Sequence, residues 1–593
     1  MCGIVGMLRL DGALLEHTHT VVCKMNEALL HRGPNGGGTF HDGPIALGHQ
    51  RLAILDLTTA GLQPMTYGRY TITYNGEIYN HRDLRADFKR LRSPFVSRTD
   101  TEVVLNAFTE WGEKCVPLLN GMFAFAIWDR VDRTLFLARD RYGQKPLYYA
   151  RVGEAFLFAS EVKALVASGL LPGGVDREAL LEYLTFQNTF GEQTLFPEVK
   201  LLPAGHTLTV RAVAVGQPVS VGQPERYWDF DFTADQTLTD EREVAEEVLR
   251  LLGQSVEHQL VADVAVGGYL SGGIDSGAIV SLATAARHTP TIRTFTCGFD
   301  LSSASGLEVA ADERAQAELV SYDVYTEHYE VVLKAGDLER AMPELARAVE
   351  EPRVGQSYPN FYVAGLASKF NKVVLSGVGG DELFGGYPWR YERYRECWQE
   401  RLMSPGDAGR LLAPLWHSLS PVRCSLPAPP VDLCRRAAAH PDPLAAALYF
   451  EAKTFLHGLL VVEDKLAMAH GLEVRFPFLD NDLVDFALRI PSAMKVCDGV
   501  GKHVLREAVR PILPAAIVDA PKRGFSAPDA SWFRGPSLAY VWRELLGEDS
   551  RIRAYVDAAV LKEFLEQHVA GQMNRRLLIW SLLSVEYFLR TYG

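Results

Sequence analysis

The sequence lacks closely spaced cysteines, a long apolar run and a secretory leader pattern. Its eight cysteines are dispersed over 593 residues without the spacing of metal ligands, which favours free thiols in a reducing compartment. No stretch approaches the roughly 18 uninterrupted apolar residues of a membrane span. The first residues also lack a basic segment followed by an apolar run and a small-residue cleavage site. We therefore expect a cytoplasmic protein with no membrane partner.

Basic residues are also fewer than acidic ones. Lysine and arginine number 60 against 73 aspartates and glutamates, which gives a net charge of −13. This balance argues against a nucleic acid as the main partner, although local basic pockets for phosphate are compatible with it. A hydrophobic content of 48% and a charged content of 22% are ordinary for a globular protein. The length allows three or four domains, or two large ones.

The pattern of apolar residues changes near residue 240. Short apolar strands separated by turns predict stacked antiparallel sheets with few long helices in residues 1–210. The strands are expected at residues 44–48, 70–74, 122–128, 134–138 and 155–159. Residues 211–240 are predicted to be a linker or an exposed hairpin.

Residues 241–593 are predicted to form a second domain around a doubly wound parallel sheet, followed by a mostly helical part. Apolar strands are expected at residues 263–270, 292–299 and 373–375. Helical periodicity at residues 241–259 and 276–287 places helices between them. Alternation of strands and helices is typical of a parallel sheet.

The second residue, Cys2, is a candidate nucleophile. If Met1 is removed, Cys2 carries a thiol with an ordinary pKa of about 8.5 and an α-amine with one of about 7.7–8.0. The amine can take the proton of the thiol near neutral pH, so no second residue is needed as the base. The alternative is that Cys2 is an incidental small residue near the start of the chain.

A glycine-rich segment between a predicted strand and a predicted helix indicates phosphate binding. Residues 267–276 read Gly-Gly-Tyr-Leu-Ser-Gly-Gly-Ile-Asp-Ser. Glycines let the backbone approach a phosphate, and the amides at the start of a helix bind anions. Ser271 and Ser276 add hydroxyl donors, and Asp275 can hold Mg²⁺ against phosphate oxygens. The segment lacks the lysine of the GxxxxGK[ST] loop, and the alternative is a sharp turn without a ligand.

A second acidic, glycine-rich turn follows the predicted strand at residues 373–375. Residues 376–387 read Ser-Gly-Val-Gly-Gly-Asp-Glu-Leu-Phe-Gly-Gly-Tyr. Ligands of doubly wound sheets collect beyond the carboxyl ends of the strands, so both turns are expected to face one nucleotide. Asp381 is then a second carboxylate for magnesium. A solvated loop in which Asp381 caps a helix is the alternative, and it leaves the five glycines unexplained.

These blocks resemble two linked enzyme domains. Cys2, His31-Arg32-Gly33-Pro34 and the segments at 51–56, 75–80 and 99–102 are similar to a class II glutamine amidotransferase of the Ntn-hydrolase type. The segments at 271–276, 376–387, 472–480 and 502–507 are similar to glutamine-hydrolysing asparagine synthetases with an ATP-pyrophosphatase domain. The resemblance covers nearly the whole chain in order. It implies glutamine, ATP and aspartate as substrates, Mg²⁺ as the cofactor, and a homodimer.

The resemblance also implies roles for residues of the N-terminal half. Cys2 attacks the side-chain amide of glutamine, and Asn75 and Gly76 form the oxyanion hole. Arg51 pairs with the α-carboxylate of glutamine, while Glu77 and Asp100 hold its α-amine. For Asp100, a helix N-cap is an equal alternative. The remaining residues implied for glutamine binding are Leu52, Ala53, Ile54 and Leu55. His31 is expected to be structural, because the terminal amine makes a second base unnecessary.

In the C-terminal half, the resemblance implies that ATP activates a carboxylate as an acyl-adenylate and releases pyrophosphate. The pyrophosphate is expected on Ser271, Gly272, Gly273, Asp275 and Ser276, with Mg²⁺ on Asp275 and Asp381. The adenosine is expected beside Leu270, Cys297, Ser376 and Gly377. Lys502 is expected to stabilise the charge that develops as pyrophosphate departs; the alternative is an exposed lysine before a helix. Ammonia must cross between the two sites without meeting bulk water.

Three positions depart from the asparagine synthetase pattern. Val378 stands where glutamate is common, and valine accepts neither a proton nor a hydrogen bond. Residues 350–360 differ from the acidic stretch expected near the aspartate site, although Arg353 is a candidate for binding a substrate carboxylate. Asn35 replaces the usual aspartate after residues 31–34. These departures leave the identity of the acceptor acid open, while they affect the expected type of reaction less.

Aspartate is the first acceptor expected, and a sugar acid, a peptide or a specialised metabolite is the alternative within the same chemistry. A β-lactam synthetase is disfavoured, because those enzymes typically lack a working Cys2. From another class, a nucleotide-binding scaffold without catalysis is supported by Val378 alone. A stand-alone glutaminase is disfavoured by the complete block at residues 271–276.

Overall fold

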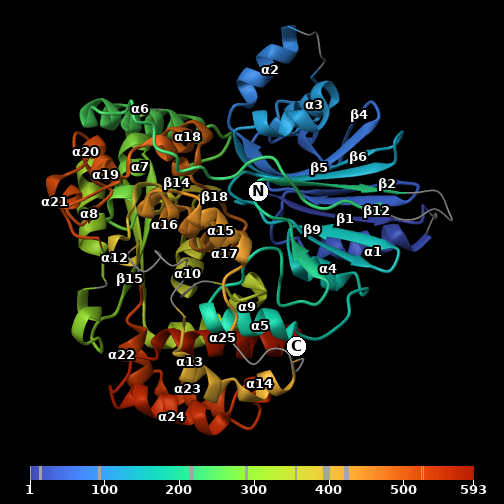
Figure 1. Cartoon of the computed structure of the whole chain (residues 1–593). Helices are drawn as coiled ribbons and strands as arrows, with labels where there is room; N and C mark the ends of the chain where they lie inside the picture. The colour runs from blue at the N-terminus through green and yellow to red at the C-terminus, as the bar shows by residue number, and fades with distance from the viewer. Residues whose placement is uncertain are drawn as a thin grey trace.

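Two stacked antiparallel sheets form the core of the N-terminal half (Figure 1). The computed structural model describes residues 2–12, 16–90, 95–212, 220–286, 291–310, 312–353, 357–391, 401–419, 426–522, 524 and 526–593. Residues 213–219 of the predicted linker and the central part of the 350–360 segment therefore lie outside the described residues.

The first sheet has the strand order β10-β8-β9-β1-β3-β2, and the second has the order β12-β11-β7-β6-β5-β4, with β13 also paired to β11. The first sheet consists of β1 (Gly3–Arg9), β2 (Gly37–Asp42), β3 (Ile45–Gln50), β8 (Tyr148–Val152), β9 (Ala155–Ala159) and β10 (Val199–Leu201). The second consists of β4 (Met65–Tyr67), β5 (Tyr70–Ile78), β6 (Gly121–Asp129), β7 (Thr134–Arg139), β11 (His206–Arg211), β12 (Ser220–Val221) and β13 (Glu225–Arg226). The sheet thus continues beyond residue 210, and the predicted domain boundary there stays a prediction.

Helices cover the outer faces of both sheets. Helices α1 (Glu16–Glu27) and α4 (Val162–Ala167) contact the first sheet, and α3 (Asp100–Trp111) contacts β5 of the second. Strand β6 is buried along its whole length because its two faces pack against different layers. The remaining elements here are α2 (His81–Arg90), α5 (Arg177–Phe186), η1 (Thr59–Gly61) and η2 (Gly112–Leu118).

A parallel five-stranded sheet forms the core of the C-terminal half, with the order β16-β15-β14-β17-β18. Its strands are β14 (Val266–Tyr269), β15 (Arg293–Phe299), β16 (Glu327–Leu333), β17 (Val373–Leu375) and β18 (Glu473–Arg475). The helices that accompany them are α6 (Glu241–Gln259), α7 (Ile274–Ala285), α8 (Arg314–Val324), α9 (Ala335–Val349) and α10 (Tyr358–Ala367), with η3 (Gly306–Ala310). The predicted fold class, stacked antiparallel sheets followed by a doubly wound parallel sheet with a helical C-terminal part, is confirmed.

The rest of the chain is mostly helical. Its larger helices are α16 (Pro443–Glu451), α17 (His457–Met468), α18 (Asn481–Arg489), α20 (His503–Val509), α23 (Leu538–Leu546), α24 (Ala558–Val569) and α25 (Arg576–Tyr592). The short elements are α11 (Gly380–Phe384), α12 (Pro388–Tyr391), α13 (Pro405–Leu411), α14 (Ala413–His417), α15 (Val431–Ala438), η5 (Ala452–Leu456), η6 (Pro477–Leu479), α19 (Ser492–Lys495), β19 (Val496–Cys497), β20 (Val500–Gly501), α21 (Ala515–Val518), α22 (Asp529–Arg534) and η7 (Ile552–Ala554). The stretch Pro443–Met468 contains a window with a mean hydropathy of 1.3, and 72% of that window is buried inside the protein.

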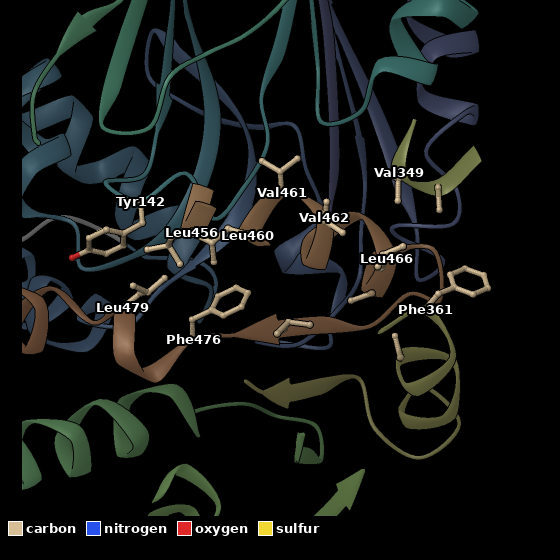
Figure 2. Close-up of a cluster of buried hydrophobic side chains, with 14 of the residues drawn as sticks. Tyr142, Val349, Phe361, Leu456, Leu460, Val461, Val462, Leu466, Phe476 and Leu479 are labelled. Carbon is tan, nitrogen blue, oxygen red and sulfur yellow. The ribbon is translucent and has the colours of Figure 1, made fainter. Parts of the chain in front are cut away.

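Helix α17 lies between the two halves of the molecule. Figure 2 shows it between the blue and teal strands of the N-terminal half and strand β18 of the parallel sheet. Leu456, Leu460 and Leu479 lie beside Tyr142 of the N-terminal half, and all four are buried. The hydrophobic core therefore continues from one half into the other along the apolar side chains of this helix.

Candidate active site

The first pocket forms where β1 of the first sheet begins beside β5 of the second. Cys2 directly precedes β1, and its backbone nitrogen donates a hydrogen bond of 2.9 Å to Asn75 Oδ1 on β5. Cys2 is half-buried and lines a cavity of about 40 Å³. Burial raises the pKa of the Cys2 thiol above its usual value. A thiol held this way needs a local base to become a nucleophile.

Asn75 and Gly76, the two residues predicted for the oxyanion hole, lie beside Cys2. The Asn75 side chain is buried, and its Nδ2 has no hydrogen-bond partner among the described residues. A buried amide donor of this kind is rarely left unpaired unless a ligand uses it. Gly76 lines the same cavity, and a Cβ there would lie 2.3 Å from the Met122 carbonyl oxygen, so the close pairing with β6 requires glycine.

Arg51 shapes one wall of the cavity. Its guanidinium donates to the carbonyl oxygens of Leu55, Asp56 and Thr58, so it fixes the loop that follows it. Leu52, Ile54 and Leu55 line the cavity, whereas Ala53 does not. The backbone nitrogen of Ala53 is instead held by Asn35 Oδ1 at 3.1 Å, which gives Asn35 a structural contact.

Two predicted carboxylates, Glu77 and Asp100, are buried in the wall of the cavity. Burial raises the pKa of both groups, and that of Glu77 is raised well above its usual value. Asp100 accepts hydrogen bonds from the Tyr74 hydroxyl (2.5 Å) and the Ile78 backbone N–H (2.9 Å). Asp100 is the first residue of α3, and the N-cap is Thr99, so the alternative that Asp100 is the cap is wrong.

The C-terminal half closes this pocket. Glu473 of β18 lines the cavity, and the Arg475 guanidinium donates to Glu77 Oε2 at 3.0 Å. Analysis of the sequence placed both residues in the block at 472–480 without giving them a role here. Gln63, Tyr74, Thr99 and Thr101 also line the cavity. Contacts between residues about 400 positions apart carry no local sequence signal.

The second site lies at the carboxyl end of β14, where a glycine loop leads into α7. Gly273 is the N-cap of α7 and no side chain caps the helix, so its first amides are available to an anion. Gly272 has a φ of +72°, and a Cβ there would lie 2.5 Å from the Gln316 Cβ, so only glycine fits. The hydroxyl oxygens of Ser271 and Ser276 lie 3.1 Å apart and form a hydrogen bond across the loop.

Lys502 joins the two carboxylates that were predicted for magnesium. Its Nζ lies 2.5 Å from Asp275 Oδ2 and 2.6 Å from Asp381 Oδ1. Lys502 is only 4% exposed, so the alternative of an exposed lysine is wrong. Burial raises the pKa of Asp275, whereas Lys502 and Lys522 outweigh burial at Asp381 and lower its pKa. Lys522, which lies 2.7 Å from Asp381 Oδ2, is a site residue that the sequence analysis missed.

The residues present fit a magnesium ion. Asp275 Oδ1 is a buried carboxylate oxygen without a hydrogen-bond partner among the described residues. Asp275 and Asp381 approach one ammonium group from two different loops, and a hard cation prefers such oxygen ligands together with phosphate oxygens. A cavity of about 1330 Å³ opens beside them and is lined by Ser271, Gly272, Gly273, Asp275, Lys502 and Lys522, among other residues.

The four residues predicted for adenosine lie at the carboxyl ends of β14, β15 and β17. Leu270, Cys297 and Ser376 are buried, and a Cβ on Gly377 would lie 3.0 Å from the Asp275 Cβ. The two glycine loops are therefore packed against each other, and the prediction that both face one nucleotide stays a prediction. None of these four residues lines the 1330 Å³ cavity itself.

A buried charge network connects the first pocket to α17. Arg32 donates to the Cys2 carbonyl oxygen (3.0 Å), to Glu161 Oε1 (2.7 Å) and to Asp464 Oδ2 of α17 (2.9 Å). Lys145 of the N-terminal half binds the other oxygen of Asp464 at 3.1 Å. His31, expected to be structural, lies 2.9 Å from Glu161 Oε2. The network ties Cys2 to the helix that borders the nucleotide loops.

Arg353 does not face the large cavity. It is 2% exposed, and its guanidinium donates to Glu351 Oε1 at 2.9 Å and to the Thr189 carbonyl oxygen at 3.2 Å. The expectation that Arg353 binds a substrate carboxylate is therefore not supported by its position. Residues 354–356 of the same segment lie outside the described residues.

Two family models match the halves of the chain. Residues 1–228 match the glutamine amidotransferase domain, and residues 247–590 match asparagine synthase. The chain belongs to the asparagine synthase family. The second pocket lies within the asparagine synthase match, whereas the first is built mainly from the amidotransferase match, with Glu473 added from the other region.

Relatives support the same family over nearly the whole length. Glutamine-hydrolysing asparagine synthetase 1 of Bacillus subtilis (strain 168) is 31% identical, with 98% of this chain and 95% of the relative covered. Glutamine-hydrolysing asparagine synthetase 3 of the same organism is 32% identical over 87% of this chain and 86% of the relative. A Penicillium rubens protein described as amidase chyE is 26% identical, with 96% and 95% covered.

Proposed function

We propose that this protein transfers the amide nitrogen of glutamine to a carboxylate that it first activates with ATP. Aspartate is the acceptor of first choice, with asparagine, glutamate, AMP and pyrophosphate as products. The observation that carries the proposal is that Cys2 lies in one pocket, walled in part by Glu473 of the parallel sheet, while an uncapped glycine loop at the carboxyl end of β14 in the same sheet opens onto a second cavity. Membership of the asparagine synthase family supports the same reaction class.

In the first half-reaction, the Cys2 thiol attacks the amide carbon of glutamine, the C–N bond breaks and ammonia leaves. Water then hydrolyses the thioester to glutamate and restores the thiol. Removal of Met1 turns the backbone nitrogen of Cys2 into an amine, and the hydrogen bond to Asn75 then orients that base. The unpaired Nδ2 of Asn75 is suited to the oxyanion. Arg51 supplies positive charge for the α-carboxylate, and Glu77 and Asp100 supply acceptors for the α-amine.

In the second half-reaction, the loop at 271–276 and the start of α7 hold the phosphates of ATP. Lys502 and Lys522 balance the charge of the departing pyrophosphate. Magnesium, held by Asp275 and Asp381, supplies additional charge neutralisation when it is bound. The apolar side chains of α17 that pack between the halves are suited to keeping water away from ammonia as it crosses.

A different carboxylate is the second candidate for the acceptor. The side chain of Val378 has no polar atom. The guanidinium of Arg353 pairs with Glu351 and does not line the large cavity. The relative described as an amidase shows that matches to this chain extend beyond proteins named asparagine synthetase. A scaffold without catalysis is disfavoured, because the carboxylates, lysines and unpaired donor of both pockets are all in place.

The test is a reaction of the purified protein with ATP, Mg²⁺, glutamine and aspartate, followed for pyrophosphate, AMP and asparagine. Formation of all three supports the proposal. Pyrophosphate formed only with another acid would contradict aspartate as the acceptor and favour the second candidate. No nucleotide turnover with any acid tested would contradict the proposed reaction and favour the scaffold.

A further inference from the structure

The two lysines of the nucleotide site reach Asp381 from separate loops. Lys502 is the N-cap of α20 and has a φ of +58°. Lys522 follows the C-cap of α21, Asp519, by three residues. Their Nζ atoms lie 2.6 and 2.7 Å from the two carboxylate oxygens of Asp381. Lysine side chains have many rotamers, so these positions depend on how firmly the two loops are held.

Arg506 of α20 joins the two loops through their backbones. Its Nε donates to the Gly501 carbonyl oxygen at 3.0 Å. Its Nη1 donates to the carbonyl oxygens of Val518 and Ala520, the latter at 3.1 Å. A single guanidinium thus connects the backbone just before Lys502 to the loop that leads to the other lysine.

The chemistry of the acceptors explains why an arginine stands here. Val518 is the last residue of α21, and the last carbonyl groups of a helix have no partner within the helix. A guanidinium presents several donors in a fixed planar arrangement, whereas a lysine ammonium is a compact point charge. Hydrogen bonds from a charged donor are also stronger than those between neutral groups. Arg506 therefore suits the task of holding several carbonyl groups at once.

The loop of Lys502 is fixed on its other side by α11. The Lys502 backbone N–H donates to the Phe384 carbonyl oxygen at 3.1 Å. A Cβ on Gly501 would lie 2.2 Å from the Gly385 carbonyl oxygen, so the two segments are in close contact. The loop before α20 is thus a firm support, and Arg506 ties the loop of Lys522 to it.

A second arginine of α20 reaches the same loop in a weaker way. Arg510, the C-cap of the helix, pairs with the Asp519 carboxylate at 3.0 Å, and both side chains are exposed. Exposed ion pairs contribute little to stability. Arg506 is half-buried and binds backbone carbonyl groups instead.

We propose that Arg506 is a positioning residue for adenylylation, which clamps the two loops so that Lys502 and Lys522 act on the pyrophosphate together. In this step an oxygen of the acceptor carboxylate attacks the α-phosphorus of ATP. The bond to the bridging oxygen breaks with its electron pair on pyrophosphate, and the two ammonium groups balance the charge that develops there. Arg506 lines the large cavity but acts through the lysines. This inference rests on the proposed function.

A double-mutant cycle of Arg506→Gln, Lys522→Gln and the double variant tests the proposal. The rate measured is the exchange of labelled pyrophosphate into ATP with Mg²⁺ and aspartate, or with the acid that supports exchange in the wild type. Each single substitution should lower the rate about tenfold or more. Because Arg506 acts through the loop of Lys522, the loss in the double variant should be clearly smaller than the product of the two single losses.

Two further variants separate positioning from general stability. Arg506→Lys keeps the charge without the forked donors, so it should recover part of the lost rate, and it replaces Arg506→Gln in the cycle if that variant does not fold. Arg510→Gln, the matched control on the same helix, should exchange pyrophosphate at nearly the wild-type rate. Glutaminase activity, which depends on the Cys2 pocket, should stay near wild type in all of these variants.

Binding of pyrophosphate with Mg²⁺, measured by titration calorimetry, gives a reading that needs no acceptor acid. Arg506→Gln should bind it about tenfold or more weakly than the wild type. Single losses that multiply in the double variant, or wild-type exchange and binding in Arg506→Gln, would overturn the proposal while exchange by the wild type upheld the proposed function. A wild type that neither exchanges nor binds pyrophosphate would overturn both.

Discussion

Single glycines set the geometry of the nucleotide loop. Gly272 combines a positive φ with a close approach to Gln316 of α8, so an added Cβ would strain the backbone and collide at 2.5 Å. Such a backbone conformation costs a non-glycine residue roughly 1–2 kcal/mol. The loop would shift away from the position in which its amides meet phosphate.

The variant Gly272→Ala should therefore weaken ATP binding about tenfold or more, because 1.4 kcal/mol corresponds to a factor of ten. The measurement is the ATP dependence of pyrophosphate exchange, with glutaminase activity followed in parallel. Gly253→Ala on α6 is the matched control, since the nearest atom to its Cβ lies at 3.9 Å. An unchanged ATP dependence in Gly272→Ala would contradict a phosphate role for the loop.

At the scale of elements, sequence patterns predicted the regular parts well. Helix α6 and strand β17 have the predicted limits, because each follows an uninterrupted periodic or apolar run. Helix α7 begins at Ile274 rather than at Ser276, because Gly273 already caps it. The role of α17 was not predicted. Its charged residues Glu463, Asp464 and Lys465 resemble a solvated face in the sequence, and only tertiary packing buries them.

Asp464 provides a test of how α17 connects the halves. Asp464→Asn removes the charge that pairs with both Arg32 and Lys145, and all three side chains are buried. Leaving a buried charge unpaired costs about 3–5 kcal/mol. We therefore expect Asp464→Asn to unfold at a clearly lower urea concentration than the wild type, measured at the midpoint of the transition.

Asp485→Asn is the matched control for this prediction. Asp485 of α18 also pairs with a cation of the N-terminal half, Arg141, but its side chain is 54% exposed. Exposed pairs contribute about 0–1 kcal/mol, so this variant should unfold close to the wild type. Equal shifts in the two variants would show that the buried pair is no stronger than the exposed one.

At the scale of the whole molecule, the two reactions should be separable by one substitution. Cys2→Ala removes the nucleophile and leaves the parallel-sheet site untouched, so glutamine-dependent amide formation should fall to background. Activity with added ammonium should stay near wild type. Both activities are measured as asparagine formed over time, with the release of pyrophosphate followed alongside. Cys23→Ala, on the outer helix α1, is the control, and loss of both activities in Cys2→Ala would contradict two separate sites.

The sequence predicted residues of both pockets, but not the residues that distant parts of the chain add to each pocket. Residue type and local pattern indicated Cys2 and the residues at 271–276, because each role depends on the local backbone, whereas Asn75 was expected from the resemblance. Lys502 was expected from resemblance, whereas Lys522, Glu473 and Arg475 required the folded arrangement, because their partners lie far away in the sequence.

The contact between Arg475 and Glu77 has a consequence for how such a protein can be divided. A fragment that ends after the amidotransferase match would expose Glu77 and lose the side of the Cys2 pocket that β18 supplies. Chimeras that exchange halves between relatives must therefore transplant this strand together with its partner residues. The boundary that is natural in the linear chain cuts through the three-dimensional unit that forms the Cys2 pocket.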